Sequence, residues 1–230
     1  QSAPPDTASA AALAEENDDV TNIYVEEYSG KPVGDLFGGG NGSWSYDETS
    51  NTLTLKTGTF RLYNYGYDSY YNNCIKWNVK IEAGATLLEA RIGSDYDSWY
   101  TVTNAGTISG GTFYSNVICK AGAVIKDGTF KKAFTVDAAD GEVTIDGGTF
   151  ENTVYVKAVD ALTIYGGTFK GGKGRSLEIG EATAVTINGG SFETDAMDFS
   201  AAATITINSG LFKDSLYNFA EHCTVNGGLF

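Results

Sequence analysis

The sequence has few of the residues on which common catalytic and metal sites depend. His222 is the one histidine, and no partner residues accompany it in the pattern of a histidine-based triad or a histidine-rich metal site. The three cysteines, Cys74, Cys119 and Cys223, cannot all pair and have no C-x-x-C spacing. We interpret them as buried or semi-buried thiols in the columns of the coils, and a Cys74–Cys119 disulfide is the alternative.

Basic residues and long apolar runs are also scarce. The chain has 15 Lys and Arg against 29 Asp and Glu, a net charge of −14, which argues against nucleic acid and anionic membranes as partners. No apolar run approaches the roughly 18 residues of a membrane span. Because residues 1–5 contain neither methionine nor an apolar signal core, we expect a mature secreted protein; a cloned fragment would look the same.

What the sequence does contain is a recurring block, typified by V-T-I-D-G-G-T-F at 143–150. In every copy an apolar residue before the turn is followed five positions later by phenylalanine. These pairs are Leu55/Phe60, Ile108/Phe113, Ile125/Phe130, Ile145/Phe150, Ile164/Phe169, Ile187/Phe192, Ile207/Phe212 and Val225/Phe230. From Phe113 to Phe230 the copies are 17 to 23 residues apart. A fixed block with spacers of variable length is typical of a solenoid.

The block indicates which side chains face the core. Val143 and Ile145 alternate with Thr144, so the apolar pair faces inward and the threonine outward. Two glycines then form a turn before Phe150. Because each spacer holds a further alternating run, each coil has three short strands. We therefore predict an all-β fold, a single-stranded right-handed parallel β-helix with about 19–20 residues per coil; the handedness follows from the rule for parallel crossovers.

Other repeat folds fit less well. Leucine-rich repeats share the period but need an L-x-x-L-x-L pattern with asparagine. A propeller needs about 40 residues per blade. A β-sandwich would not repeat one motif with a fixed offset.

The chain divides into three parts. We expect a flexible acidic and alanine-rich arm at 1–20, an N-terminal cap with the first strands at 21–58, and the β-helix at 59–230. Within the β-helix, coils 61–105 are irregular and rich in aromatics, and coils 106–230 are regular. Trp44 and Tyr46 are suited to covering the first coil, and Asp47–Asn51 indicates a hairpin turn.

Two similar aromatic stretches lie within the irregular coils. Tyrosine and tryptophan rings can stack on sugar rings while neighbouring carboxylates bind hydroxyl groups, and exposed aromatic patches often mark binding sites. We expect both stretches on one side of the solenoid as a glycan-binding platform; the alternative is that the rings pack against the solenoid wall. The candidate site consists of Tyr67, Asp68, Tyr70, Tyr71, Tyr96, Asp97, Trp99 and Tyr100.

Other patterns point to structure more than to chemistry. Threonines such as Thr144 and Thr163 predict an outward ladder, and Asn188, Asn208 and Asn226 predict a hydrogen-bonded asparagine ladder at one corner. We expect no cofactor. Calcium is the one alternative, at Asp95 and Asp97 or at Asp137 and Asp140, although no calcium-binding repeat is present. No cluster of acids in matching register marks a catalytic groove.

The C-terminal coil predicts a contact with another molecule. The repeats continue to Phe230 without an atypical capping repeat, so an open core and a free strand edge are expected there. End-to-end self-association through this coil is one expectation, and truncation of a longer chain is another.

The repeats resemble a known group of proteins. The I-x-G-G-T-F blocks, the W-S-Y-D at 44–47 that leads to L-T-L at 53–55, and I-E-A-G-A-T-L at 81–87 are similar to β-helical surface proteins of bacteria. These include repeat-rich exported proteins of gut Firmicutes and, more distantly, pertactin-like passengers and clostridial carbohydrate-binding β-helices. The resemblance covers residues 44–230 and implies export, surface display, and adhesion or glycan contact; no catalytic residue maps onto this chain.

We therefore expect a secreted or cell-surface, non-catalytic β-helix for adhesion or carbohydrate binding, with a polysaccharide or a cell-surface glycan as partner. A polysaccharide lyase or glycoside hydrolase of the β-helix type, and a passive stalk of a larger surface protein, are the alternatives.

Overall fold

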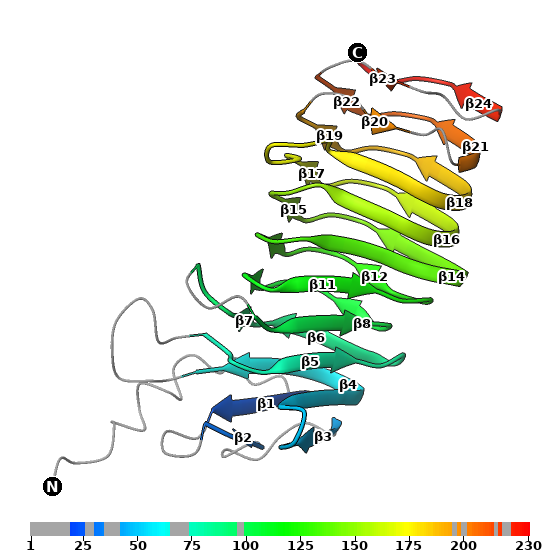
Figure 1. Cartoon of the computed structure of the whole chain (residues 1–230). Helices are drawn as coiled ribbons and strands as arrows, with labels where there is room; N and C mark the ends of the chain where they lie inside the picture. The colour runs from blue at the N-terminus through cyan, green and yellow to red at the C-terminus, as the bar shows by residue number, and fades with distance from the viewer. Residues whose placement is uncertain are drawn as a thin grey trace, which may run out of the picture.

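The computed structural model of the chain is an all-β solenoid in which strands of successive coils pair in parallel (Figure 1). The structure describes residues 19–25, 30–34, 42–64, 74–95, 99–194, 197–198, 202–213, 216–217 and 222–230, and these contain no helix. The predicted parallel β-helix is confirmed. Of the arm expected at 1–20, residues 1–18 lie outside the described residues.

Each coil passes over three faces. Face 1 contains the first halves of β4 (Thr52–Tyr63), β14 (Phe134–Ile145), β16 (Val154–Ile164) and β18 (Leu177–Ile187), with β5 (Asn78–Ile81), β8 (Thr101–Asn104), β11 (Asn116–Cys119), β20 (Met197–Asp198) and β23 (Leu216–Tyr217). Face 2 contains β1 (Val20–Val25), the second halves of those long strands, and β6 (Ala85–Glu89), β9 (Thr107–Ile108), β12 (Val124–Ile125), β21 (Ala202–Ile207) and β24 (His222–Val225).

Face 3 is a separate sheet of seven two-residue strands. These strands are β7 (Arg91–Ile92), β10 (Thr112–Phe113), β13 (Thr129–Phe130), β15 (Thr149–Phe150), β17 (Thr168–Phe169), β19 (Ser191–Phe192) and β22 (Leu211–Phe212). In β14, β16 and β18 the strands of faces 1 and 2 join into one bent strand, so these coils have two strands where three were expected. The join occurs because residues at the bend also pair between coils, as Ala138 does with Val159 and Val159 with Ala182.

A column of phenylalanines fills the core behind face 3. From Phe113 to Phe230 the ring centroids of neighbouring coils are 4.6–5.0 Å apart, with the rings nearly parallel. Phe134 adds an edge contact to Phe150, with 4.8 Å between the centroids. Each fully buried ring contributes about 1.5–3 kcal/mol by leaving water. The predicted column is confirmed, and it fixes the register of the coils.

The two glycines before face 3 have different roles. A Cβ on Gly147 would lie 2.6 Å from the carbonyl oxygen of Lys126 in the preceding coil, so the close approach of the two backbones requires glycine. Gly148 has a φ of 103°, a conformation that residues with a side chain rarely adopt. Where Asp127 or Ser209 occupies the first position, the φ of the following glycine is 139° or 140°, so the corner adjusts to the larger residue.

The first copy of the block lies elsewhere than the sequence predicted. Phe60 pairs with Leu87 on face 2, so Leu55 and Phe60 do not correspond to the later pairs, and this assignment was wrong. Leu87 pairs with Ile108, and Ile92 pairs with Phe113. The pair Leu87/Ile92 has the same offset of five residues but has neither the glycines nor the phenylalanine, which is why the pattern missed it.

The N-terminal end of the stack is covered by antiparallel strands. β3 (Ser43–Asp47) pairs antiparallel with β4 through the predicted turn, and β2 (Pro32–Val33) pairs antiparallel with β1. Trp44 and Tyr46 are half-buried against the core, as expected of a cap. Parallel pairing with β5 already starts at Thr52, ahead of the boundary expected at residue 59.

Both side-chain ladders on the outer surface are present. Thr144, Thr163 and Thr186 are in register on face 2. At the glycine corner, Asn208 Nδ2 donates to Asn188 Oδ1 at 2.8 Å, and Asn226 Nδ2 donates to Asn208 Oδ1 at 2.7 Å. These interactions stabilise the stacking of coils, as the sequence predicted.

Candidate functional site

Most of the predicted aromatic platform lies outside the described residues. These members are Tyr67, Asp68, Tyr70, Tyr71, Tyr96 and Asp97. Of the two described members, Trp99 is 87% exposed, whereas Tyr100 is half-buried and packs against the core. Trp99 is therefore the one described platform residue whose ring is available to a ligand.

The described residues that flank the two aromatic stretches lie at different corners of the coil. Asn64 follows β4 on face 2, and its Nδ2 donates to the carbonyl oxygen of Cys74 at 2.9 Å, which ties the ends of 65–73 together. Ile75 then pairs with Ile92 on face 3. The second stretch begins after Ile92, at the other end of face 3. The loops themselves lie outside the described residues, so their expected position on one side of the solenoid stays a prediction.

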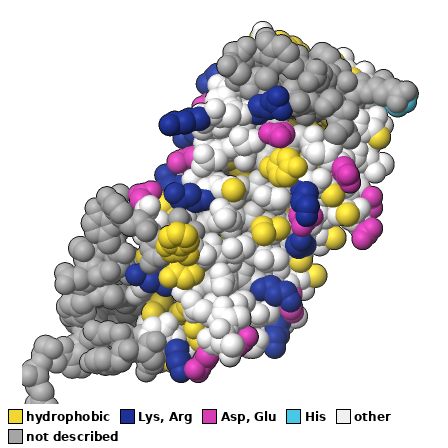
Figure 2. Space-filling view, viewed as in Figure 1, with side chains coloured by type: hydrophobic (Ala, Val, Ile, Leu, Met, Phe, Trp, Pro, Cys, Tyr) yellow, Lys and Arg dark blue, Asp and Glu magenta, His cyan; other side chains and the backbone are white. Residues whose placement is uncertain are grey.

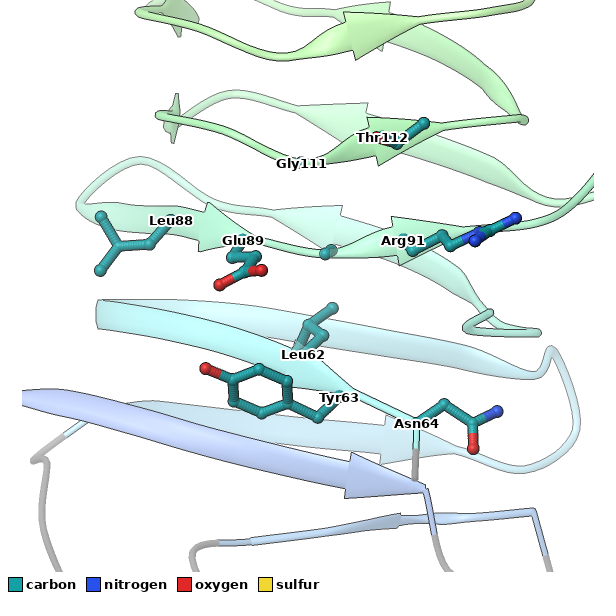
Figure 3. A pocket seen from close by; sticks show the side chains of 9 residues that line it. Leu62, Tyr63, Asn64, Leu88, Glu89, Arg91, Gly111 and Thr112 are labelled. Carbon is teal, nitrogen blue, oxygen red and sulfur yellow. The ribbon is translucent and has the colours of Figure 1, made fainter. Parts of the chain in front are cut away.

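A groove with a volume of about 530 Å³ opens at the corner between faces 2 and 3. Its walls come from three successive coils: the end of β4, the corner between β6 and β7, and the start of β10 (Figure 3). The lining residues are Leu62, Tyr63, Asn64, Leu88, Glu89, Ala90, Arg91, Gly111 and Thr112. At one end the groove is bordered by Asn64, the last described residue before 65–73.

The groove presents both signs of charge and several neutral hydrogen-bonding groups. The Glu89 carboxylate points toward the coil of Tyr63, while the Arg91 side chain extends along the opposite side (Figure 3). Tyr63 is held by stacking on Tyr24, with 5.6 Å between the ring centroids. With the Asn64 amide and the Thr112 hydroxyl, these groups form a set of donors and acceptors that suits a ligand with many hydroxyl groups.

The sequence did not identify this groove, although it carries a signal. Leu88-Glu89-Ala90-Arg91 occupies the corner that holds glycines in the later coils, between the core residues Leu87 and Ile92. Glu89 and Ala90 take the places of the two glycines, and Arg91 is in register with Thr112, so this corner carries charged side chains. A search for the offset of five residues alone, without the glycines, would have found it.

Beside the groove, two cationic side chains of neighbouring coils lie over one aromatic ring at face 3. The Arg91 guanidinium lies over the ring of Tyr114, 5.2 Å from its centroid, and the Lys131 Nζ lies 5.7 Å from the same centroid. Lys131 also forms an ion pair with Glu151 at 2.7 Å, which is the main cause of the raised pKa of Lys131. The hydrogen bond and the charge of Glu151 hold this lysine in its charged form.

The three cysteines offer no reactive thiol or disulfide in this structure. Burial raises the pKa of the Cys119 thiol to about 12, with the neighbouring Asn104 acting in the opposite direction, so Cys119 is protonated and unreactive. None of the three cysteines forms a disulfide, so the interpretation as unpaired thiols holds and the Cys74–Cys119 alternative does not.

Of the acidic residues proposed as calcium ligands, one has lysine partners and another lies outside the described residues. Asp137 is bound by Lys120 at 2.7 Å and by Lys157 at 3.4 Å, and these lysines lower its pKa. Asp97 lies outside the described residues. Within the described part of the chain, no three His, Cys, Asp or Glu side chains are close enough to share a metal ion. The described residues also contain no helix of the length and apolar character needed to cross a membrane.

Comparison with known proteins gives no relative from which a function could be transferred. No protein-family model matches this chain, and neither a curated protein nor a solved structure does.

Proposed function

We propose that this chain is an exported, non-catalytic β-helix of the bacterial surface type that binds carbohydrate. The observation that supports this proposal is the groove of Tyr63, Glu89, Arg91 and Thr112, which is also lined by Asn64, the residue before the aromatic stretch in the sequence. A carboxylate, a guanidinium, a hydroxyl and an amide on a rigid stack of strands provide the directional hydrogen bonds that a sugar requires. Trp99, at the other end of face 3, offers an exposed ring for stacking.

Binding fits the groove better than hydrolysis does. Glycoside hydrolysis requires two carboxyl groups on opposite sides of the scissile bond, one of them as acid. Among the described residues that line the groove, Glu89 is the only acidic one. The described lining therefore supports sugar binding better than hydrolysis.

Glycan arrays test this function. We expect the wild type to bind a defined set of glycans, and a Glu89→Gln, Thr112→Val double variant to bind them at least tenfold more weakly, because hydrogen bonds to charged groups contribute about 1.5–3 kcal/mol. Glu82→Gln, which removes an exposed acid outside the groove, serves as control. Trp99→Ala tests the stacking ring separately. Release of products from polysaccharides would support the enzyme alternative, and absence of binding and of products would support the stalk.

We also propose that the C-terminal coil binds a second copy of the chain. Phe230 is 62% exposed, although it continues a column in which Phe212 is 2% exposed. Val225 and Leu229 are exposed beside it, and no described strand pairs with the outer edge of β24. The N-terminal end of the stack is covered by β3 and, within the part of the chain that the structure describes, offers no free strand edge of the same kind. We therefore expect a symmetric contact in which the C-terminal coils of two copies meet.

Sedimentation velocity tests this contact. We expect the wild type to form dimers in a concentration-dependent manner and a Leu229→Lys, Phe230→Lys variant to be monomeric. Tyr165→Lys, at an exposed aromatic residue on the side of the stack, should dimerise like the wild type. A wild type that remains monomeric at all concentrations would contradict the proposal.

A further inference from the structure

Nearly half of the positive charge of this acidic chain lies along face 3 and the turns that follow it. Seven of the 15 Lys and Arg residues are there, although the net charge is −14. They are Arg91, Lys131, Lys132, Lys170, Lys173, Arg175 and Lys213. In the orientation of Figure 1, dark blue side chains follow the left edge of the stack, where β15, β17 and β19 lie (Figure 2).

The residues that follow the phenylalanines form a row in which the charges alternate in sign from Lys131 onward. The row, here called the charged row, consists of Tyr114, Lys131, Glu151, Lys170, Glu193 and Lys213, and each residue donates its backbone N–H to the coil beneath. Glu151 pairs with Lys131 at 2.7 Å, and Glu193 pairs with Lys213 at 3.1 Å. Each glutamate thus already has a lysine, and Lys170 between them is left over.

Three lysines on this strip make no ion pair with any described residue: Lys132, Lys170 and Lys173. Lys170 and Lys173 flank Gly171 and Gly172, whose φ values of 69° and 58° fold the chain into a tight bulge. That bulge rests on the coil beneath, because a Cβ on Gly172 would lie 2.8 Å from Asn152 Oδ1. Asn152 in turn donates to the carbonyl oxygen of Lys131, which precedes Lys132. The three lysines therefore belong to one continuous surface.

A row of hydroxyl groups runs beside the charged row. This hydroxyl row consists of Thr112, Thr129, Thr149, Thr168 and Ser191, which are in register and half-buried. Its spacing is that of the strands, about 4.8 Å per coil. Thr112 also lines the groove, and Arg91, which lines it too, pairs with Thr112 in the sheet. The groove and face 3 therefore form one path along the solenoid axis.

We infer that face 3 binds a linear acidic polysaccharide, whose anionic groups contact Lys132, Lys170 and Lys173 and whose hydroxyl groups contact the hydroxyl row. This inference rests on the proposed carbohydrate binding and names the class of glycan. Unpaired lysines attract carboxylate or sulfate groups, and the repeat of the hydroxyl row suits a repeating polymer that lies along the axis. The acidic remainder of the surface repels the same polymer, which confines it to face 3.

Binding of four polymers to the full chain tests the inference. The probes are polygalacturonate, dextran sulfate, neutral dextran and a dT oligonucleotide, each measured by isothermal titration calorimetry at low and at physiological salt. We expect the two acidic polysaccharides to bind, more weakly at higher salt, and the neutral dextran not to bind face 3. Tighter binding of polygalacturonate or of dextran sulfate identifies the anionic group as carboxylate or sulfate.

A matched pair of triple variants locates the contact. Lys132→Gln, Lys170→Gln, Lys173→Gln should weaken binding of the acidic polysaccharide at least tenfold, whereas Lys56→Gln, Lys80→Gln, Lys157→Gln, with the same loss of charge outside face 3, should weaken it less than threefold. Equal losses in both triples would overturn the inference, as would equal binding of the oligonucleotide. If glycans bind at the groove but acidic polymers do not bind at all, only the inference fails; if no glycan binds, the proposed function fails with it.

Discussion

Phe150→Ala is expected to lower the free energy of unfolding by about 3–5 kcal/mol, because the structure cannot close the cavity that the ring leaves. Phe150 is fully buried and stacks on Phe130 and Phe169, with ring centroids 4.9 and 4.7 Å away. Phe134 contacts it edge-on from face 1. The ring thus packs against neighbours in both adjacent coils, and its loss removes contacts on all of these sides. Urea denaturation followed by circular dichroism measures the change.

Two further variants separate the effect of burial from the effect of substitution. Thr149→Ala, in the same strand but facing outward, is expected to cost well under half as much. Phe230→Ala should also cost less than Phe150→Ala, because Phe230 has a ring on one side only and is largely exposed. Equal denaturation midpoints for Phe150→Ala and Thr149→Ala would show that the assignment of inward and outward positions is wrong.

The regular coils were predictable because their residues stack on their own copies. An inward phenylalanine, an outward threonine and a corner asparagine each recur at one place in the coil, so the period of the sequence is also the period of contacts. The two glycines are also explained at this level, since Gly147 approaches a backbone carbonyl and Gly148 has a positive φ. The charged row is also present in the sequence, since each of its members directly follows a phenylalanine of the repeat.

The irregular coils were less predictable because the same offset of five residues occurs at two different corners of the coil. Leu55 and Phe60 are five residues apart, like Ile145 and Phe150, but they cross the corner from face 1 to face 2. Only the register in which the strands of neighbouring coils pair distinguishes the two corners, and a single sequence does not show that register. The groove was missed for a related cause: Tyr63, Glu89 and Thr112 come from three coils, and only the stacking of those coils brings them together.

The second large effect is expected at the N-terminal end of the stack, where Trp77→Ala should cost about 3–5 kcal/mol. Trp77 is 1% exposed, and its Nε1 donates to the carbonyl oxygen of Gly30 at 2.8 Å. Its ring also contacts Tyr46 of β3, with 6.0 Å between the centroids. One side chain thus joins the first coil to β3 and to the segment that precedes β2, a role that an isolated tryptophan does not reveal in the sequence.

Trp99 provides a control of the same residue type, because it is 87% exposed. Trp99→Ala should change the free energy of unfolding by less than about 0.5 kcal/mol, and it should remove the tryptophan fluorescence that acrylamide quenches most readily. Trp77→Phe should fall between the two, because it keeps an aromatic ring but leaves the Gly30 carbonyl without its donor, a loss of about 0.5–1.5 kcal/mol or more. If Trp77→Ala and Trp99→Ala unfold at the same urea concentration, Trp77 does not hold the cap, and the first coil is stabilised by β3 and β4 alone.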